Sequence, residues 1–256
     1  MQLQITGNTT CPRRSSCSSQ FKARLFRLPG RMASTLLCFG LAAAGFAGYW
    51  LDRPYTHVLA SMAVSLSALS TKQKANIANA ARRLDGVVLK PGQEFSFNGI
   101  VGPRTSSRGW LAAPSYVGND SPATLGGGIC LLSSAIYQDA LRAGLQVTER
   151  VPHLRTIKSI AAGLDATVWY GMTDLRFRNT LDCPLQLVTT YTPNKVTVEL
   201  RGNTQNRNWH PARITRLERR ISPALLRVEV YSQQVTQERL VTRDIYAIPT
   251  TGEKHR

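Results

Sequence analysis

The stretch from Gly126 to Leu145, GGGICLLSSAIYQDALRAGL, decides how the surrounding sequence is interpreted. Its apolar residues recur at the three- and four-residue spacing of one helix face, at Leu132, Ala135, Ile136, Ala140 and Leu141. Gly144 follows the pattern, where glycine is favoured just after a helix end. The segment predicts a helix over residues 131–143, entered through three glycines and Cys130.

A second helix is expected upstream of this stretch. Thr71 is a candidate N-cap for an amphipathic segment that ends at Asp85-Gly86. Residues 87–89 and 94–98 then alternate as strands around a Lys-Pro-Gly turn, which predicts a short hairpin. A long loop rich in Gly and Pro, residues 99–128, leads into the glycine run, and loops of this length inside a domain are usually functional.

Downstream of the central helix the chain is rich in strand patterns. They cover residues 145–149, 154–157, 166–170, 175–178, 185–191 and 196–200. Residues 213–220 form a basic stretch, and residues 225–232 and 239–248 suggest a final hairpin. The order helix, hairpin, helix and then strands predicts an α+β fold, with the central helix packed on a mostly antiparallel sheet.

The composition suits one globular domain with tails and a strongly basic character. The chain has 256 residues, of which 43% are hydrophobic, and 32 Lys and Arg against 15 Asp and Glu give a formal charge of +17. Such a charge favours polyanionic partners, namely nucleic acid, anionic lipid or acidic wall polymers. Nucleic acid is the least favoured partner, because much of the charge lies in the leader and the tail rather than along one face.

The N-terminus has the layout of a segment directed to a membrane. Residues 1–32 form a basic leader without acidic residues, and residues 33–51 are uncharged up to Leu51. We expect the run to be a membrane anchor, or a cleaved signal that releases a secreted or periplasmic protein, with everything after Asp52 exported. Residues 52–70 are then a linker, residues 71–192 the main domain, and residues 193–256 a basic C-terminal β extension.

Cys130 sits where a nucleophile is expected. A thiolate at a helix N-terminus is stabilised by the helix dipole, and the free amide groups there suit an oxyanion. Gly127 and Gly128 allow the backbone to approach another group closely. A nucleophilic cysteine also needs a base and an orienting acceptor, for which His153 is the candidate base and Asp165 or Asp174 the acceptor.

Plainer interpretations remain open for the same residues. Cys130 is equally well explained as a buried apolar residue or as one half of a disulfide with Cys183, the other cysteine of the exported part. The glycine run also suits a bound phosphate or carboxylate. The scattered histidines have no zinc-ligand spacing, and the chemistry needs neither a metal nor an organic cofactor.

Four motifs together resemble the VanW family: PGQEFSFNGIVGPRT, GGGICLLSSAIYQDALRAGL, ERVPH and GLDATVWYGMTDLRFRN, spread over residues 72–192. The resemblance implies a secreted or membrane-anchored bacterial protein of the cell envelope. It places Cys130, His153, Asp165 and Asp174, with Asn98 and Arg104, on matching motif positions. Members of the family commonly have Gln after the cysteine, where this chain has Leu131.

The expected function is binding or modification of peptidoglycan or a related wall polymer. As an enzyme, the chain would use Cys130, His153 and Asp165 or Asp174 for thiol-dependent acyl transfer or hydrolysis, with amide groups near Gly128 holding the oxyanion. As a noncatalytic wall-binding module, it would present a groove lined by Arg104, Arg108, Trp110 and Tyr116. The oligomeric state is not encoded in any pattern that we recognise.

Overall fold

The structure is a computed structural model that describes residues 55–115, 123–204, 209–234 and 236–248. Its first layer is a four-stranded antiparallel sheet. Its strand order is β1 (His57–Ser65), β9 (Lys195–Gly202), β8 (Leu185–Thr192) and β2 (Val88–Leu89). Every second residue is buried along β9 and in the first half of β8, so one face of the sheet forms the core. Strand β1 occupies much of the expected linker, residues 52–70, and makes that segment part of the domain.

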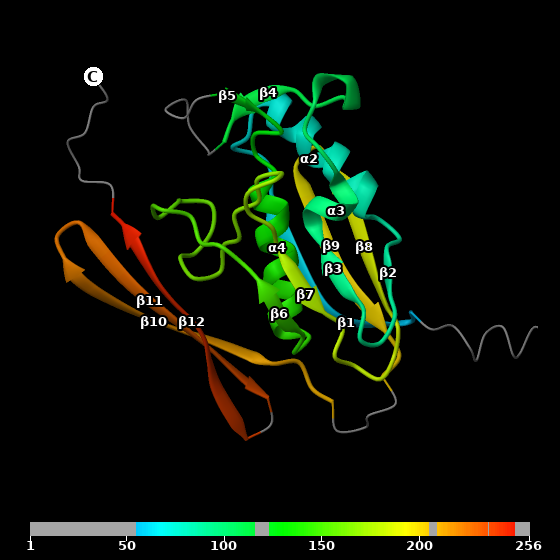
Figure 1. Ribbon diagram of the computed structural model, residues 1–256, viewed down its shortest axis with the longest axis vertical. Helices are drawn as coiled ribbons and strands as arrows, with labels where there is room; N and C mark the ends of the chain where they lie inside the picture. The colour runs from blue at the N-terminus through cyan, green and yellow to red at the C-terminus, as the bar shows by residue number, and fades with distance from the viewer. Residues whose placement is uncertain (1–54, 116–122, 205–208, 235, 249–256) are drawn as a thin grey trace, which may run out of the picture. The chain divides into compact units, whose positions relative to one another are not determined.

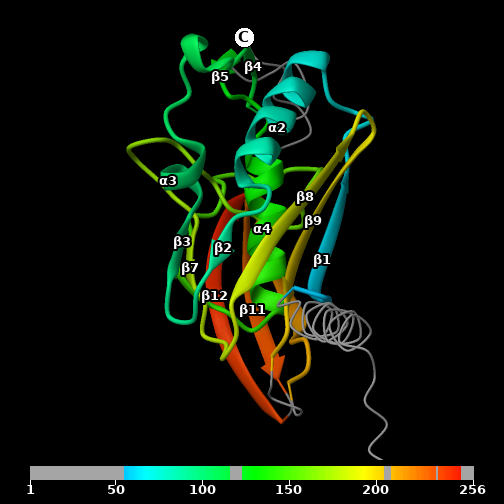
Figure 2. The ribbon, with the colours of Figure 1, turned by 90° about the vertical axis from the view of Figure 1, so that its right-hand side faces the viewer.

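Two helices cover this sheet. Helix α2 (Thr71–Leu84) packs on β8, and helix α4 (Cys130–Arg142) packs on β1 and β9. The cap of α2 is Ser70, one residue before the expected Thr71, because Ser70 and Gln73 form a reciprocal capping box. Helix α4 confirms the prediction from the glycine-led stretch. In Figure 2, strand β8 passes in front of α4.

A second sheet lies beside α4 and has the order β3 (Glu94–Ser96), β7 (Arg176–Arg178) and β6 (Gln146–Glu149). The rings of Phe95 and Phe177 stack across its β3–β7 pair with centroids 4.5 Å apart. The predicted hairpin over residues 87–98 is wrong, because β2 pairs with β8 and β3 with β7. Residues 97 and 98 instead begin the short helix α3 (Phe97–Val101).

The loop before the glycine run is anchored by a small sheet. A 3-10 turn, η1 (Ser106–Arg108), leads to β4 (Ala112–Pro114), which pairs with β5 (Ala123–Leu125). Strand β5 enters the glycines directly. The sheet β4–β5 therefore fixes the position at which α4 begins.

A long three-stranded sheet completes the fold, formed by β10 (Arg213–Ser222), β11 (Leu225–Gln234) and β12 (Gln237–Ala247). The predicted final hairpin is confirmed as β11–β12, and the basic stretch becomes β10 beside it. In Figure 1 this sheet, coloured orange to red, lies on the opposite side of α4 from β8 and β9. The described residues of this sheet belong to the same compact unit as the rest of the described chain.

The fold is α+β, as expected, and rich in antiparallel strands. The basic leader and the apolar run, residues 1–51, lie outside the described residues. Within the described residues, no helix combines the length and the apolar character that a membrane span requires.

Candidate functional site

Cys130 lines a cavity of about 880 Å³ at the N-terminus of α4. The cavity is bounded by the glycine run, the end of β5, His153 and residues 167–170. The thiol is partly exposed, and its Sγ lies 3.8 Å from the carbonyl oxygen of Val168. Cys183 is also a free cysteine, buried next to Gly202, so the structure does not contain the alternative disulfide.

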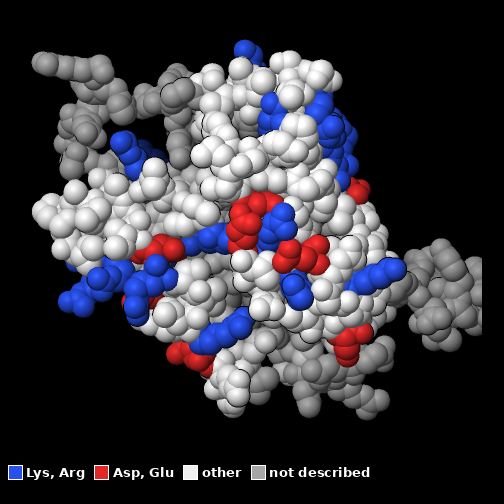
Figure 3. Space-filling model, viewed as in Figure 1, with Lys and Arg blue, Asp and Glu red and all other residues white. Residues whose placement is uncertain are grey.

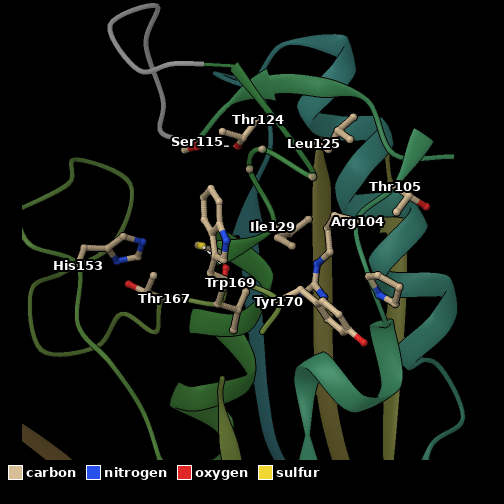
Figure 4. Close-up of a pocket in the computed structure, with 16 residues that line it drawn as sticks. Arg104, Thr105, Ser115, Thr124, Leu125, Ile129, His153, Thr167, Trp169 and Tyr170 are labelled. Atoms are coloured by element: carbon tan, nitrogen blue, oxygen red, sulfur yellow. Dashed lines mark hydrogen bonds between the residues drawn. The ribbon is translucent and has the colours of Figure 1, made fainter. Parts of the chain in front are cut away.

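His153 and Asp165 meet beside this thiol. Asp165 Oδ2 lies 2.7 Å from Nδ1 of His153 and accepts a hydrogen bond of 2.6 Å from the His153 backbone N–H. Both side chains are nearly fully buried, at 2% and 1% exposure. The imidazole borders the same cavity as Cys130, and Figure 4 shows it pointing into that cavity from the left. The sequence prediction that these residues converge agrees with this geometry.

The electrostatics of the site follow from these contacts. Burial alone would lower the pKa of His153, but hydrogen bonds to Asp165 and Cys130 outweigh it and raise the pKa to about 9. Burial alone would raise the pKa of Asp165, but the hydrogen bond from His153 and the charge of Arg150 lower it to about 2. At neutral pH the site therefore holds an imidazolium between a carboxylate and the sulfur of Cys130.

Asp165 has a second set of partners, which the sequence interpretation missed. Its Oδ1 accepts hydrogen bonds from Arg150 Nη2 at 2.9 Å and from the hydroxyl of Tyr246 at 2.6 Å. Arg150 also forms an ion pair with Asp244, and the Tyr246 hydroxyl accepts from the Gly163 N–H at 2.7 Å. Tyr246 and Asp244 belong to β12, so the C-terminal sheet supports the carboxylate that orients His153.

Helix α4 fixes the strand-like segment that carries Asp165. Ser133 Oγ donates to the carbonyl oxygen of Ala166 at 2.7 Å, and Ser134 Oγ accepts from the Ala166 N–H at 2.9 Å. Ser134 Oγ also donates to the Cys130 carbonyl oxygen at 2.6 Å. The two serines of the quoted stretch therefore set the position of Asp165 relative to Cys130.

The glycines allow α4 to begin close to β4. A Cβ atom on Gly127 would lie 2.0 Å from the carbonyl oxygen of Ala113, a distance that no side chain tolerates. Asn76, buried on α2, donates to the Gly127 carbonyl oxygen at 3.0 Å and holds the loop from below. Gly128 has φ +98°, a backbone conformation that strongly favours glycine.

Two backbone N–H groups at the glycine run, those of Gly128 and Cys130, have no backbone carbonyl acceptor among the described residues. The N–H groups of residues 126, 127, 129 and 131 all donate to backbone carbonyl oxygens. Within the described part of the chain, no backbone carbonyl accepts a hydrogen bond from the Gly128 or the Cys130 N–H. These two amides refine the broader prediction that groups near residues 128–131 hold an oxyanion.

Of the predicted substrate-binding residues, Arg104 lines the cavity and Trp110 and Asn98 support it. Asn98 Oδ1 accepts from Arg104 Nη2 at 2.7 Å, and the Asn98 amide group donates to the Thr173 carbonyl oxygen at 2.8 Å. Trp110 is 1% exposed, and its ring centroid lies 5.8 Å from the Arg104 guanidinium. Tyr116 lies outside the described residues, and Arg108 donates to the Val101 carbonyl oxygen from a mainly exposed turn.

Asp174 belongs to a different cluster. Its carboxylate accepts hydrogen bonds from Ser96 Oγ at 2.6 Å and from the Asn98 N–H at 2.8 Å, and it pairs with Arg176 at 3.3 Å. These contacts join β7 to the start of α3. The carboxylate that meets the imidazole is therefore that of Asp165, while Asp174 lies in this separate cluster.

The surface does not form one uniform basic patch on the face shown in Figure 3, where Asp and Glu side chains lie between groups of Lys and Arg. An ion-pair cluster of this kind joins Arg176 to Glu94 and Glu149 at 3.0 and 3.2 Å. In the portion of the chain that the structure describes, no group of three or more His, Cys, Asp and Glu side chains is arranged to hold a metal ion.

Comparisons with known proteins agree with the motif pattern. The family model described as "VanW like protein" matches residues 72–201. The chain is 40% identical over 110 residues to the uncharacterized protein YoaR of Bacillus subtilis, covering 43% of this chain and 36% of YoaR. It is 28% identical over 128 residues to the vancomycin B-type resistance protein VanW of Enterococcus faecalis, covering 47% of this chain and 46% of that protein.

These alignments cover less than half of either relative. No solved structure is significantly similar to the chain. The match ends at residue 201, before β10–β12, so Asp244 and Tyr246 lie outside it.

Proposed function

Because the chain belongs to the VanW family, with the family model matching residues 72–201, we propose that it acts in the bacterial cell envelope on the peptide part of a wall polymer. The reaction is thiol-dependent cleavage or transfer of an acyl group. A relative that is named for vancomycin resistance supports the envelope role. The basic leader and the uncharged run of residues 33–51 support export of the domain, through an anchor or a cleaved signal.

The observation that carries this proposal is the convergence of Cys130, His153 and Asp165 on one cavity. The imidazole hydrogen-bonds to Asp165, Cys130 contributes to its raised pKa, and both Cys130 and His153 line the cavity wall. A nucleophile, a base and an orienting carboxylate in this arrangement are the parts that covalent acyl transfer requires. A cysteine with only a packing role needs neither the cavity nor the buried ion pair.

The reaction follows from the charge distribution. In the reacting state the Cys130 proton lies on the His153 imidazole, and the sulfur attacks the carbonyl carbon of an amide. The C–N bond then breaks, the imidazolium proton passes to the departing amine, and an acyl thioester remains on Cys130. The neutral imidazole next takes a proton from water or from an acceptor amine, whose attack on the thioester releases the acyl product and restores the ion pair.

The N–H groups of Gly128 and Cys130 are the available donors for the oxyanion of both tetrahedral intermediates. The carbonyl oxygen thus finds its donors in the backbone, and the chain does not require the family's usual Gln at position 131. Leu131 is instead 6% exposed and packs in the core. Donors of this kind contribute about 3 kcal/mol each to transition-state stabilisation.

The test is to trap the acyl-enzyme. The purified chain is incubated with soluble peptidoglycan fragments that keep their stem peptides, and intact-mass spectrometry follows an adduct on Cys130 that hydroxylamine removes. We expect the adduct in the wild type and in Cys183→Ser, a matched control at a buried cysteine away from the cavity. Cys130→Ala forms none, and His153→Ala forms it at least about 100-fold more slowly.

A noncatalytic wall-binding module gives a different result. Fragments would then bind equally well to the wild type and to Cys130→Ala, and no adduct or new product would form with any fragment. That outcome would refute acyl transfer while leaving the envelope role in place.

A further inference from the structure

Arg104 is a partly buried cation in the cavity wall and forms no ion pair with any carboxylate of the described residues. It donates to the carbonyl oxygen of Gly102 and to Asn98 Oδ1, and its guanidinium lies 5.6 to 5.9 Å from the ring centroids of Phe97, Trp110 and Tyr170. Arg104 is absent from the ion pairs formed among the described residues. Two of its five N–H groups are used in these hydrogen bonds, which leaves a free edge for a ligand.

Arg150 shows how this fold treats a buried arginine that has only a structural role. Its guanidinium is paired with Asp165 at 2.9 Å and with Asp244. Although burial alone would lower it, Tyr137, Tyr246 and the two carboxylates raise the pKa of Arg150. Burial instead lowers the pKa of Arg104 to about 10, because neighbouring groups compensate for it only partly. A partly buried cation without a carboxylate partner costs free energy, so its place in a cavity wall suits an anionic ligand.

The position of Arg104 relative to the nucleophile narrows the choice of anion. Arg104 and Cys130 line the same cavity, and the sulfur is close enough to raise the pKa of the guanidinium. Figure 4 shows Arg104 to the right of the Trp169 indole and His153 to its left. Cys130 thus has a proton donor in His153 and a fixed cation in Arg104. A planar guanidinium fits a carboxylate through two parallel hydrogen bonds.

We propose that Arg104 binds the C-terminal carboxylate of the substrate peptide, so that the site attacks the amide bond of the last residue. This inference rests on the proposed function. The sulfur bonds to the carbonyl carbon of the penultimate residue, the C–N bond breaks, and the His153 proton passes to the amine. The terminal amino acid, whose carboxylate Arg104 has held during the reaction, then leaves the site. The rings of Trp169 and Tyr170, about half exposed at the cavity rim, contact the rest of the peptide.

The experiment measures binding without turnover. The full chain with Cys130→Ala is titrated calorimetrically with two synthetic stem peptides that differ only at the C-terminus, one a free acid and one a carboxamide. We expect the acid to bind at least about 10-fold more tightly, since the carboxamide cannot form the bidentate charge-assisted contact with the guanidinium. Adding Arg104→Gln removes the preference, whereas Arg82→Gln, at an exposed arginine of α2 outside the cavity lining, keeps it.

Three outcomes would overturn the inference: equal binding of acid and amide with Arg104 intact, no binding of either peptide, or a preference that survives Arg104→Gln. The first two need no variant at Arg104, so misfolding of that variant does not protect the proposal. A carboxylate preference without an acyl-enzyme in the wild type would refute the proposed function and support only the carboxylate-binding role of Arg104. Acylation by acid and amide at equal rates would do the reverse.

Discussion

Replacing Tyr246 by Phe tests whether the C-terminal sheet is part of the site. The change removes one oxygen at a residue that is 1% exposed and leaves the ring in place. It deletes the 2.6 Å hydrogen bond to ionised Asp165, worth about 2 kcal/mol, and leaves the Gly163 N–H without its 2.7 Å acceptor, at about 1–2 kcal/mol. We therefore expect the free energy of unfolding to fall by about 3–4 kcal/mol.

Urea unfolding, followed by circular dichroism, measures that loss, and amide hydrogen exchange gives a local readout. The Gly163 N–H should be protected in the wild type and exchange faster in Tyr246→Phe, even under conditions where both proteins are folded. Tyr231→Phe is the matched control, because the Tyr231 hydroxyl bonds to Glu229 on β11, away from Asp165. Equal unfolding free energies for the wild type and Tyr246→Phe, with unchanged Gly163 exchange, would refute the role of β12.

Three further predictions use other parts of the structure. Burial raises the pKa of Asp139 to about 8, so the unfolded chain loses this proton at a lower pH than the folded chain. The unfolding free energy of the wild type should therefore fall by up to about 4 kcal/mol between pH 4 and pH 7, relative to that of Asp139→Asn, in parallel urea titrations. Gly127→Ala should abolish folding by its clash with β4, whereas Gly92→Ala, with positive φ but open space, should cost about 1–2 kcal/mol in the same assay. Iodoacetamide should alkylate Cys130 at pH 7 about 10-fold more slowly in His153→Ala, and an unchanged rate would contradict the imidazole–sulfur contact.

Local patterns in the sequence predicted the local elements of the fold. Helices α2 and α4 follow from apolar spacing, and the pairs β8–β9 and β11–β12 join neighbouring segments. The failed hairpin shows the limit of such patterns. Strands β2 and β3 have two and three residues, and each pairs with a strand that lies far along the chain. Pairing over that separation depends on the packed core, which no short pattern encodes.

Strand β1 was missed for a related reason. Its sequence, HVLASMAVS, is rich in Ala and Ser, and its burial does not alternate cleanly along the strand. Such a segment resembles a linker until β9 and α4 are placed against it. Met62 and Val64, which pack against the core, alternate weakly with polar or small residues, and this alternation is the feature of the sequence that could have indicated a strand.

The site was predicted where short motifs contain the chemistry and missed where the fold brings in distant residues. Cys130, His153 and Asp165 lie in three recognisable motifs, and the choice between Asp165 and Asp174 needed the structure. Arg150 and Tyr246 were not identified, because a charge beside a strand and a tyrosine near the C-terminus have no distinctive local pattern. Their role depends on β12 reaching Asp165 from 81 residues away.

The central claim is that the His153 imidazole is coupled both to Asp165 and to the Cys130 sulfur. The most direct test is an NMR titration of the His153 ring in the wild type and in Cys130→Ala. We expect a midpoint near pH 9 in the wild type and a clearly lower one in the variant, because the contribution of the sulfur is lost. A midpoint near 6.5 that is the same in both proteins would contradict it.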